Sequence, residues 1–328
     1  MKQRALGPFQ VGEIGLGCMN LSHAYGVPPT ASDAKRLILR ALELGVDHFD
    51  TAVLYGFGHN EELVGEVLKP VRSQVVLASK GGLTGVDGKR VIDGRPASIK
   101  RDCEASLRRL QTEVIDLYYL HRWDKSVPIE DSVGAMADLA AEGKIRSLGL
   151  SEVSKATLER AHRVHPIAAV QSEYSLWTRN SEIAVLNACV ELGVSFVAFS
   201  PLGRGFLTGY DLNPDAFVAG DIRRSMPRFQ PPHFEKNLVV LEAFRALAAE
   251  WKLSAAQVSL AWLLAQGGNI LPIPGTTSLA HLEEDIESCT LELTPEQHDR
   301  VDNIVNSRTV NGARYSHAVS LEVDMEEE

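Results

Sequence analysis

Cysteine is scarce in this chain of 328 residues, and its four cysteines lie far apart in the sequence. They are Cys18, Cys103, Cys189 and Cys289, and no two of them form a Cys-x-x-Cys pair. Neither a metal cluster nor a disulfide framework is therefore expected. The simpler interpretation of the cysteine pattern is that the protein resides in a reducing compartment.

Long apolar runs are also missing. The longest, such as SLAWLLAQ at 259–266, are too short to span a bilayer. No long apolar stretch precedes Glu13, so the N-terminus lacks the pattern of a secretory signal. We expect a soluble cytoplasmic protein.

Positive charge is in deficit. Lys and Arg number 33 and Asp and Glu number 43, which gives a net charge of 33 − 43 = −10. An acidic chain is repelled by nucleic acid and by anionic membrane surfaces, so neither is an expected partner. A small anionic ligand would need only a local positive site. Nothing in the sequence indicates an oligomeric state.

The chain does contain a regular alternation of short apolar runs and longer amphipathic ones, in a composition that is 45% hydrophobic. The predicted strands are 12–19, 46–52, 75–80, 114–121, 145–151, 167–175, 195–203 and 269–275. The predicted helices are 33–46, 60–69, 98–111, 129–144, 154–165, 184–193, 237–251 and 278–288.

Eight strands, nearly all followed by a helix, predict a single (β/α)8 barrel domain over 1–328. The strands are mostly continuous apolar runs, which is typical of parallel strands buried on both faces. A doubly wound open sheet is the alternative, but the first strand lacks the GxGxxG spacing of a dinucleotide-binding turn.

Three segments stand outside this repeat. Residues 1–11 predict a hairpin that turns at Gly7-Pro8 and caps the N-terminal mouth of the barrel. Residues 203–237, between strands seven and eight, are rich in Gly, Pro and Arg and predict a lid or ligand clamp. Roughly the last twenty residues, 309–328, predict an acidic and partly disordered tail.

Polar side chains stand where three neighbouring strands end. Asp50 ends strand two in HFDTAVLYGFG, and Tyr55 follows on a glycine-flanked loop. Lys80 ends strand three and His121 ends strand four. In a (β/α)8 barrel the carboxyl ends of the strands form one face, so we expect these four side chains to meet there.

These four residue types suit the reduction of a carbonyl group. A free tyrosine is a poor acid near neutral pH, but a neighbouring ammonium lowers its pKa. Asp50 would hold Lys80 charged, and Tyr55 could then protonate an alkoxide as it forms. Taken singly, each residue also has a plain interpretation: an exposed loop tyrosine, a structural ion pair, a strand-end histidine.

At this point the sequence resembles the aldo-keto reductases, over nearly the whole chain from GLGCM to about Ser288. The resemblance is carried by Asp50, Tyr55, Lys80 and His121, which match the family's catalytic tetrad. Further matches are GKIRSLGLSE, AAVQSEYSLW, FSPLGRGFLTG and PIPGTTSLAHLEED, most like the bacterial and plant branch of aldehyde and ketone reductases. The resemblance implies a barrel, an NADPH cofactor and a small-molecule carbonyl substrate.

The resemblance also implies a set of cofactor-binding residues. Ser151 and Gln171 match positions that hydrogen-bond the nicotinamide carboxamide, and Phe199 replaces the tyrosine that commonly stacks on the ring. The remaining implied cofactor residues are Gly17, Cys18, Met19 and Asp50 at the first strands, Ser200, Leu202, Gly203 and Arg204 over the pyrophosphate, and Gly275, Thr276, Thr277, Ser278, His281, Glu284 and Asp285 around the 2′-phosphate and adenine. Glu152 stands where some branches have Asn.

The loop Gly275–Ser278 departs from the family pattern because it has no Lys or Arg to pair with the 2′-phosphate. NADPH is therefore the first expectation, and use of NADH is also possible. Simple helix capping is the alternative interpretation of Thr276, Thr277 and Ser278. Arg204 could equally be an ordinary surface charge.

On the substrate side, Met19, Tyr25, Tyr55, His121 and Trp123 are expected to line the mouth, together with the loop 223–234. Trp123 could instead pack beneath its own loop. Cys18 could make the activity sensitive to oxidation or be a buried, inert thiol.

Two other functions compete with carbonyl reduction. One is a Schiff-base lyase or isomerase with Lys80 as nucleophile, which a carboxylate partner of Lys80 argues against. The other is a regulatory module that binds cofactor with little turnover, which an intact tetrad argues against.

Overall fold

Eight parallel strands form one sheet in this computed structural model, which describes residues 1–22, 24–86, 89–209 and 212–326. The strand order is β12-β11-β10-β9-β8-β5-β4-β3. Their bounds are β3 (Leu16–Gly17), β4 (His48–Asp50), β5 (Val76–Gly81), β8 (Ile115–Leu120), β9 (Ile145–Ser151), β10 (Ile167–Glu173), β11 (Ser195–Phe199) and β12 (Ile270–Pro272). Each strand overlaps one of the eight predicted ranges.

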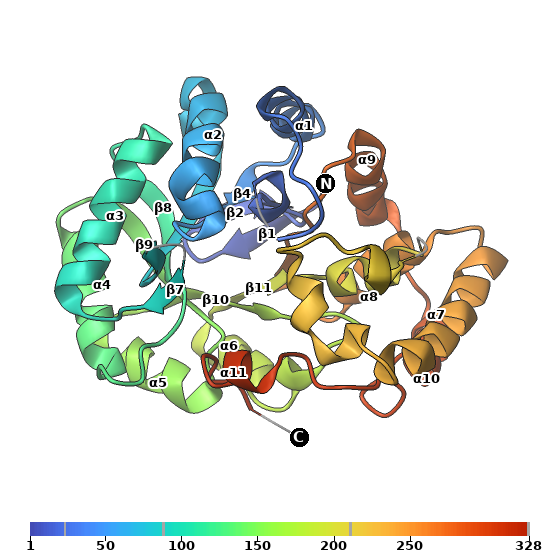
Figure 1. Ribbon diagram of the computed structural model, residues 1–328. Coiled ribbons are helices and arrows are strands. Elements are labelled where there is room, and N and C mark those ends of the chain that lie inside the picture. Colours follow the sequence, from blue (N-terminus) through green and yellow to red (C-terminus); the bar gives the residue numbers. More distant parts are fainter. Residues whose placement is uncertain (23, 87–88, 210–211, 327–328) are drawn as a thin grey trace.

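The first and last strands of the sheet meet, which closes the ring. The backbone N–H groups of Gly15 and Gly17 donate to the carbonyl oxygens of Pro272 and Pro274, at N···O distances of 3.0 and 2.9 Å. Helices surround the strands as an outer layer (Figure 1). The predicted (β/α)8 barrel is confirmed.

The N-terminal hairpin is also present. It pairs β1 (Gln3–Leu6) with β2 (Phe9–Gly12) around a turn at Gly7 and Pro8. Leu6 and Val11 are fully buried and pack against interior strand residues such as Leu117. The hairpin thus caps one mouth of the barrel with apolar side chains, which leaves the opposite mouth for a site.

The outer layer forms because each helix buries one apolar face against the strands. In α1, for example, Ala34, Leu37, Ile38 and Ala41 are buried, as their spacing predicts. The helices are α1 (Ala31–Glu43), α2 (His59–Leu68), α3 (Pro96–Leu110), α4 (Ile129–Ala141), α5 (Lys155–Val164), α6 (Val185–Leu192), α7 (His233–Glu250), α8 (Ala255–Ala265), α9 (Leu279–Glu287), α10 (Pro295–Ile304) and α11 (His317–Ser320).

Some elements lack a sequence prediction. A second hairpin, β6 (Leu83–Val86) with β7 (Lys89–Ile92), follows β5. Helix α8 is buried nearly all round, so it has no amphipathic rhythm to mark it as a helix. Helices α10 and α11 lie beyond the barrel repeat and also went unpredicted.

Two of the segments outside the repeat lie at the open mouth. The described part of 203–237 consists of short 3-10 turns leading into α7. The C-terminal residues pair with the barrel, since Val153 and Asp324 form a parallel bridge and the Ser154 N–H donates to the Asp324 carboxylate at 3.2 Å. No helix within the described ranges is long and apolar enough to cross a membrane.

Candidate active site

Three adjacent strands carry the predicted polar residues to one mouth of the barrel. Asp50 ends β4, Lys80 is the second-last residue of β5, and His121 directly follows β8. In the sheet β4 pairs with β5 and β5 with β8, so the three side chains are neighbours. Tyr55 begins a short 3-10 turn in which Gly56 has a φ of +56°, a conformation that glycine adopts readily.

Lys80 stands at the centre of this group, with its side chain almost completely buried. Its ammonium donates to the Asp50 carboxylate, to the Thr51 carbonyl oxygen at 2.9 Å and to the Tyr55 hydroxyl at 3.4 Å. Burial alone would lower the pKa of Lys80, but Asp50 and Tyr55 outweigh it and raise that pKa above the ordinary value. Lys80 is therefore an ammonium at neutral pH.

The second oxygen of the Asp50 carboxylate accepts a hydrogen bond from the Gln171 amide nitrogen at 2.7 Å. Asp50 is thus held from two sides, by Lys80 and by a residue that the family resemblance assigns to the cofactor. This double contact fixes the direction of the carboxylate and, through it, the position of the ammonium.

Two opposing influences act on Tyr55. Burial raises its pKa, and the charge of Lys80 lowers it by a smaller amount, so the pKa of Tyr55 stays above its ordinary value. The net direction is opposite to the sequence-based expectation of a lowered pKa. The expected effect of Lys80 is present, but the desolvation of the phenol exceeds it.

His121 faces Tyr55 edge-on, with ring centroids 5.9 Å apart and an angle of 87° between the rings. Burial, together with the charges of Arg122 and Lys80, holds the pKa of His121 well below its ordinary value. His121 is therefore a neutral imidazole at neutral pH. It can still donate one N–H to an oxygen in the cavity.

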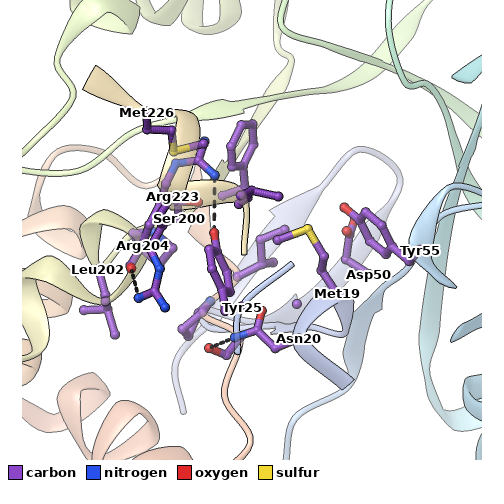
Figure 2. A pocket seen from close by; sticks show the side chains of 18 of the residues that line it. Met19, Asn20, Tyr25, Asp50, Tyr55, Ser200, Leu202, Arg204, Arg223 and Met226 are labelled. Carbon is purple, nitrogen blue, oxygen red and sulfur yellow. Dashed lines mark hydrogen bonds between the residues drawn. The ribbon is translucent and has the colours of Figure 1, made fainter. Parts of the chain in front are cut away.

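A cavity of about 600 Å³ opens beside this group. Figure 2 shows Asp50 and Tyr55 on one side of it and Arg204, Arg223 and Met226 on the other, with Met19 and Tyr25 between them. Sixteen of the predicted site residues line it: Gly17, Met19, Tyr25, Asp50, Tyr55, His121, Ser151, Gln171, Phe199, Ser200, Leu202, Arg204, Gly275, Thr276, Thr277 and His281.

Other predicted site residues do not line this cavity. Lys80 lies behind Tyr55 and Asp50. Trp123 donates from its indole N–H to the Val127 carbonyl oxygen at 2.9 Å, so it packs on its own loop. The rest of this set is Cys18, Gly203, Ser278, Glu284 and Asp285, of which Cys18 is a fully buried free thiol and Asp285 a buried carboxyl whose pKa burial raises.

The loop before α9 caps that helix and lines a second depression. The Ser278 hydroxyl accepts from the His281 N–H and caps α9, so the capping interpretation holds for Ser278. Thr277 and Ser278 also line a second depression of about 550 Å³, together with Arg36 and Asp33 of α1, which pair with each other at 3.2 Å. A cation thus stands near this loop although the loop itself has none.

Arg204 is not an ordinary surface charge. Its guanidinium is buried, pairs with Glu173, and donates to the hydroxyl groups of Tyr25 and Tyr315 at 3.3 and 3.2 Å. Burial would raise the pKa of Glu173, but Arg204 and Arg314 hold it below its ordinary value. The ion pair therefore ties the loop after β11 to β10.

Several cavity residues were missed from the sequence. Arg122 follows His121 directly and was overlooked because a charged residue after a strand is usually solvated. Arg90 comes from the unpredicted β6–β7 hairpin, and Tyr315, Ser316 and Val319 come from the predicted tail. No local pattern marks the tail residues, because their contacts are to segments far away in sequence.

A parallel barrel with Asp, Lys and His at adjacent strand ends, and a buried Tyr between them, defines a barrel enzyme site. The Aldo/keto reductase family model matches residues 13–306. The chain belongs to the aldo/keto reductase family, whose members are NAD(P)H-dependent oxidoreductases acting on carbonyl groups.

Relatives in sequence and in structure agree with this assignment. The chain is 41% identical to a probable aldo-keto reductase 1 of Glycine max over 310 residues, which are 94% of this chain and 89% of that protein. It superimposes on the glycerol dehydrogenase of Gluconobacter oxydans with a TM-score of 0.85, 31% identity and coverage of 96% and 98% of the two chains. An aldo-keto reductase of Klebsiella pneumoniae in complex with NADPH gives a TM-score of 0.72, 26% identity and coverage of 96% and 99%.

Proposed function

We propose that this protein is an NADPH-dependent carbonyl reductase in which Tyr55 protonates the carbonyl oxygen. The observation that carries the proposal is the Lys80 ammonium, which is bonded to Asp50 and lies 3.4 Å from the Tyr55 hydroxyl at the wall of a cavity. A phenol beside a fixed ammonium is a general acid whose phenolate is stabilised as it forms.

Each residue of the group has one task. Tyr55 gives its proton to the oxygen as negative charge develops there. Lys80 then faces a phenolate, which its positive charge favours, and Asp50 keeps Lys80 in place. Neutral His121 donates a hydrogen bond to the same oxygen and so positions the carbonyl.

The cavity residues suit a nicotinamide cofactor. When bound, NADPH supplies the hydride that reduces the carbonyl carbon. Ser151 and Gln171 offer polar groups beside Asp50, and Phe199 offers an aromatic face in the same cavity wall. Thr277, Ser278 and Arg36 offer hydroxyl groups and a cation for a 2′-phosphate at the other end. The Klebsiella relative in complex with NADPH supports this choice of cofactor.

The site does not favour Schiff-base chemistry. A nucleophilic lysine must be neutral, and Asp50 and Tyr55 raise the pKa of Lys80 instead. Borohydride trapping of a substrate adduct on Lys80 would contradict this conclusion.

The first experiment compares the wild type with Tyr55→Phe, using an activated aromatic aldehyde and either NADPH or NADH. Loss of the reduced-nicotinamide absorbance reports turnover. We expect kcat to fall by roughly 10²- to 10⁴-fold in Tyr55→Phe, the usual contribution of general acid catalysis. The same assay gives the preference between the two cofactors.

Tyr118→Phe is the matched control, because Tyr118 is also buried but belongs to the core outside the cavity. Its kcat should stay close to that of the wild type. Unchanged turnover in Tyr55→Phe would contradict the proposed role of Tyr55 as the general acid. Tight binding of NADPH without turnover of any aldehyde would favour a regulatory module.

A further inference from the structure

The charges that line the active-site cavity do not all have partners. Three of its four arginines form ion pairs: Arg90 with Glu322 at 2.5 Å, Arg204 with Glu173, and Arg223 with Asp221 at 2.7 Å. The one carboxylate among the lining residues, Asp50, is taken by Lys80. The fourth arginine, Arg122, has no carboxylate within 4.0 Å among the residues that the structure describes.

Arg122 is nevertheless a buried side chain, with 8% of its surface exposed. One terminal nitrogen, Nη1, donates to the His121 carbonyl oxygen at 2.6 Å and to the Ser151 hydroxyl at 3.2 Å. Its Nε is buried and has no hydrogen-bond partner in the described part of the chain. Among the described residues, both hydrogen-bond acceptors of this guanidinium are therefore neutral groups.

A buried charge without a counter-ion is costly, because it has lost water and gained no opposite charge in return. In Arg90, Arg204 and Arg223 the protein supplies that opposite charge itself. At Arg122 the described residues supply none, although the chain as a whole is acidic with a net charge of −10. The missing negative charge is then expected to come from what enters the cavity.

The position of Arg122 indicates which part of a ligand it meets. It follows His121 at the end of β8 and touches Ser151 at the end of β9, so it lies beside the reacting group and not at the outer mouth. Arg122 and Arg90 both act electrostatically on His121, which stays neutral. Of the three cations that act on His121, Lys80 and Arg90 are each paired with a carboxylate, and Arg122 has no such partner among the described residues.

We propose that the site reduces carbonyl compounds that carry a carboxylate close to the carbonyl group, and that Arg122 binds this carboxylate. The proposal rests on the carbonyl reductase function proposed above. The reaction balance is that of any carbonyl reduction: the carbon receives the hydride of NADPH, the oxygen receives the proton of Tyr55, and NADP⁺ is left. The carboxylate is bound and released unchanged.

The test uses phenylglyoxylate and its methyl ester, two ketones that differ in the negative charge. The quantity measured is the ratio of kcat/KM for the acid to kcat/KM for the ester, with NADPH as cofactor. We expect the wild type to prefer the acid by roughly 10-fold or more, because a charge-assisted hydrogen bond contributes on this scale.

Arg122→Met should lower that ratio by roughly 10- to 100-fold, and Arg122→Lys, which keeps the charge but not the planar fork, should give an intermediate ratio. Arg300→Met is the control. It removes an arginine of an exposed ion pair with Glu250, outside the residues that line the cavity, so the ratio should move by less than about 3-fold.

The outcomes separate this proposal from the function on which it rests. No turnover of either ketone or of an aromatic aldehyde would overturn the reductase function. Turnover with a wild-type ratio near or below one would overturn only the assignment of an anionic substrate, and this result does not depend on any variant folding. Weaker NADPH binding in Arg122→Met, measured by fluorescence, with an unchanged ratio would assign Arg122 to the cofactor and also overturn the proposal.

Discussion

Buried histidines show how single residues tie the stability of this barrel to pH. His48 is fully buried in β4, and both its ring nitrogens lack a hydrogen-bond partner among the described residues. Burial lowers the pKa of His48 below its ordinary value of 6.5, and nearby Asp50 and Asp47 do not offset this. Burial and nearby cations likewise hold the pKa of His121 well below its ordinary value.

The direction of the pH effect follows from proton counts. Below pH 6.5 the unfolded chain takes up a proton at His48 and the folded chain does not, until the pH reaches the lower folded pKa. Acid therefore favours unfolding in this window, by about 1.4 kcal/mol per pH unit for each such histidine. Stability should be highest above pH 6.5 and fall as the pH falls.

We predict that His48→Leu flattens this dependence below pH 6.5, by at most about 1.4 kcal/mol per pH unit, because it removes one of the groups that titrate. Urea denaturation at pH 7, 6 and 5 measures it. An unchanged slope in His48→Leu would show that His48 is protonated in the folded protein.

Also at the residue scale, the sequence predicted which side chains lie together. It did not predict their pKa values equally well. Asp50, Tyr55, Lys80 and His121 could be placed because each stands at a strand end, and strand ends converge in a barrel. The net pKa of Tyr55 could not be foreseen, because it depends on how much of the phenol is desolvated. Arg122 was missed for a related reason: nothing local shows that a residue after a strand will be buried.

At the scale of elements, the C-terminal segment completes the wall of the site. Arg314 pairs with the buried carboxylate of Glu152, 162 positions earlier, and lies 3.9 Å from that of Glu173. Tyr315 beside it lines the cavity and accepts from Arg204. A segment that composition alone would describe as an acidic tail thus carries the cation that balances a carboxylate next to Ser151.

We predict that Arg314→Met lowers the free energy of unfolding by about 3–5 kcal/mol, because it leaves Glu152 buried without a positive partner. The double variant Arg314→Met/Glu152→Gln should recover part of this loss. Equilibrium urea denaturation measures both. Arg300→Met, which breaks an exposed pair with Glu250, is the control and should change stability little. Equal effects of Arg314→Met and Arg300→Met would contradict the importance of burial.

Elements were predictable where a local rhythm marked them. The barrel strands and helices such as α1 have apolar residues at the spacing of their structure. Helix α8 was missed because it is apolar on all sides, and α7 begins at His233, four residues before its predicted start, because Pro232 precedes it. The pairing of the tail with Glu152 and Ser154 depends on the closed barrel, which no local pattern contains.

At the scale of the whole molecule, the barrel depends on the seam where β3 meets β12. Gly17 donates to Pro274 across this seam and also lines the cavity. A Cβ atom on Gly17 would lie 2.7 Å from the carbonyl oxygen of Ile273, which is backbone and cannot rotate away. The absence of a side chain at Gly17 is therefore a condition for closing the ring.

We predict that Gly17→Ala destabilises the protein by more than about 2 kcal/mol and weakens NADPH binding, because the seam must open to admit the methyl group. Thermal unfolding and fluorescence titration with NADPH measure the two effects. Gly134→Ala is the matched control: it adds the same methyl group inside α4, where nothing lies within 4 Å, and should stabilise the protein by about 0.5–1 kcal/mol. If the two substitutions changed the stability in the same direction, closure at Gly17 would not limit the stability of the barrel. Opposite signs would show that an added methyl group lowers stability where the first and last strands meet and raises it in the outer layer. The close approach of the backbone at the seam would then be what keeps the cavity in shape.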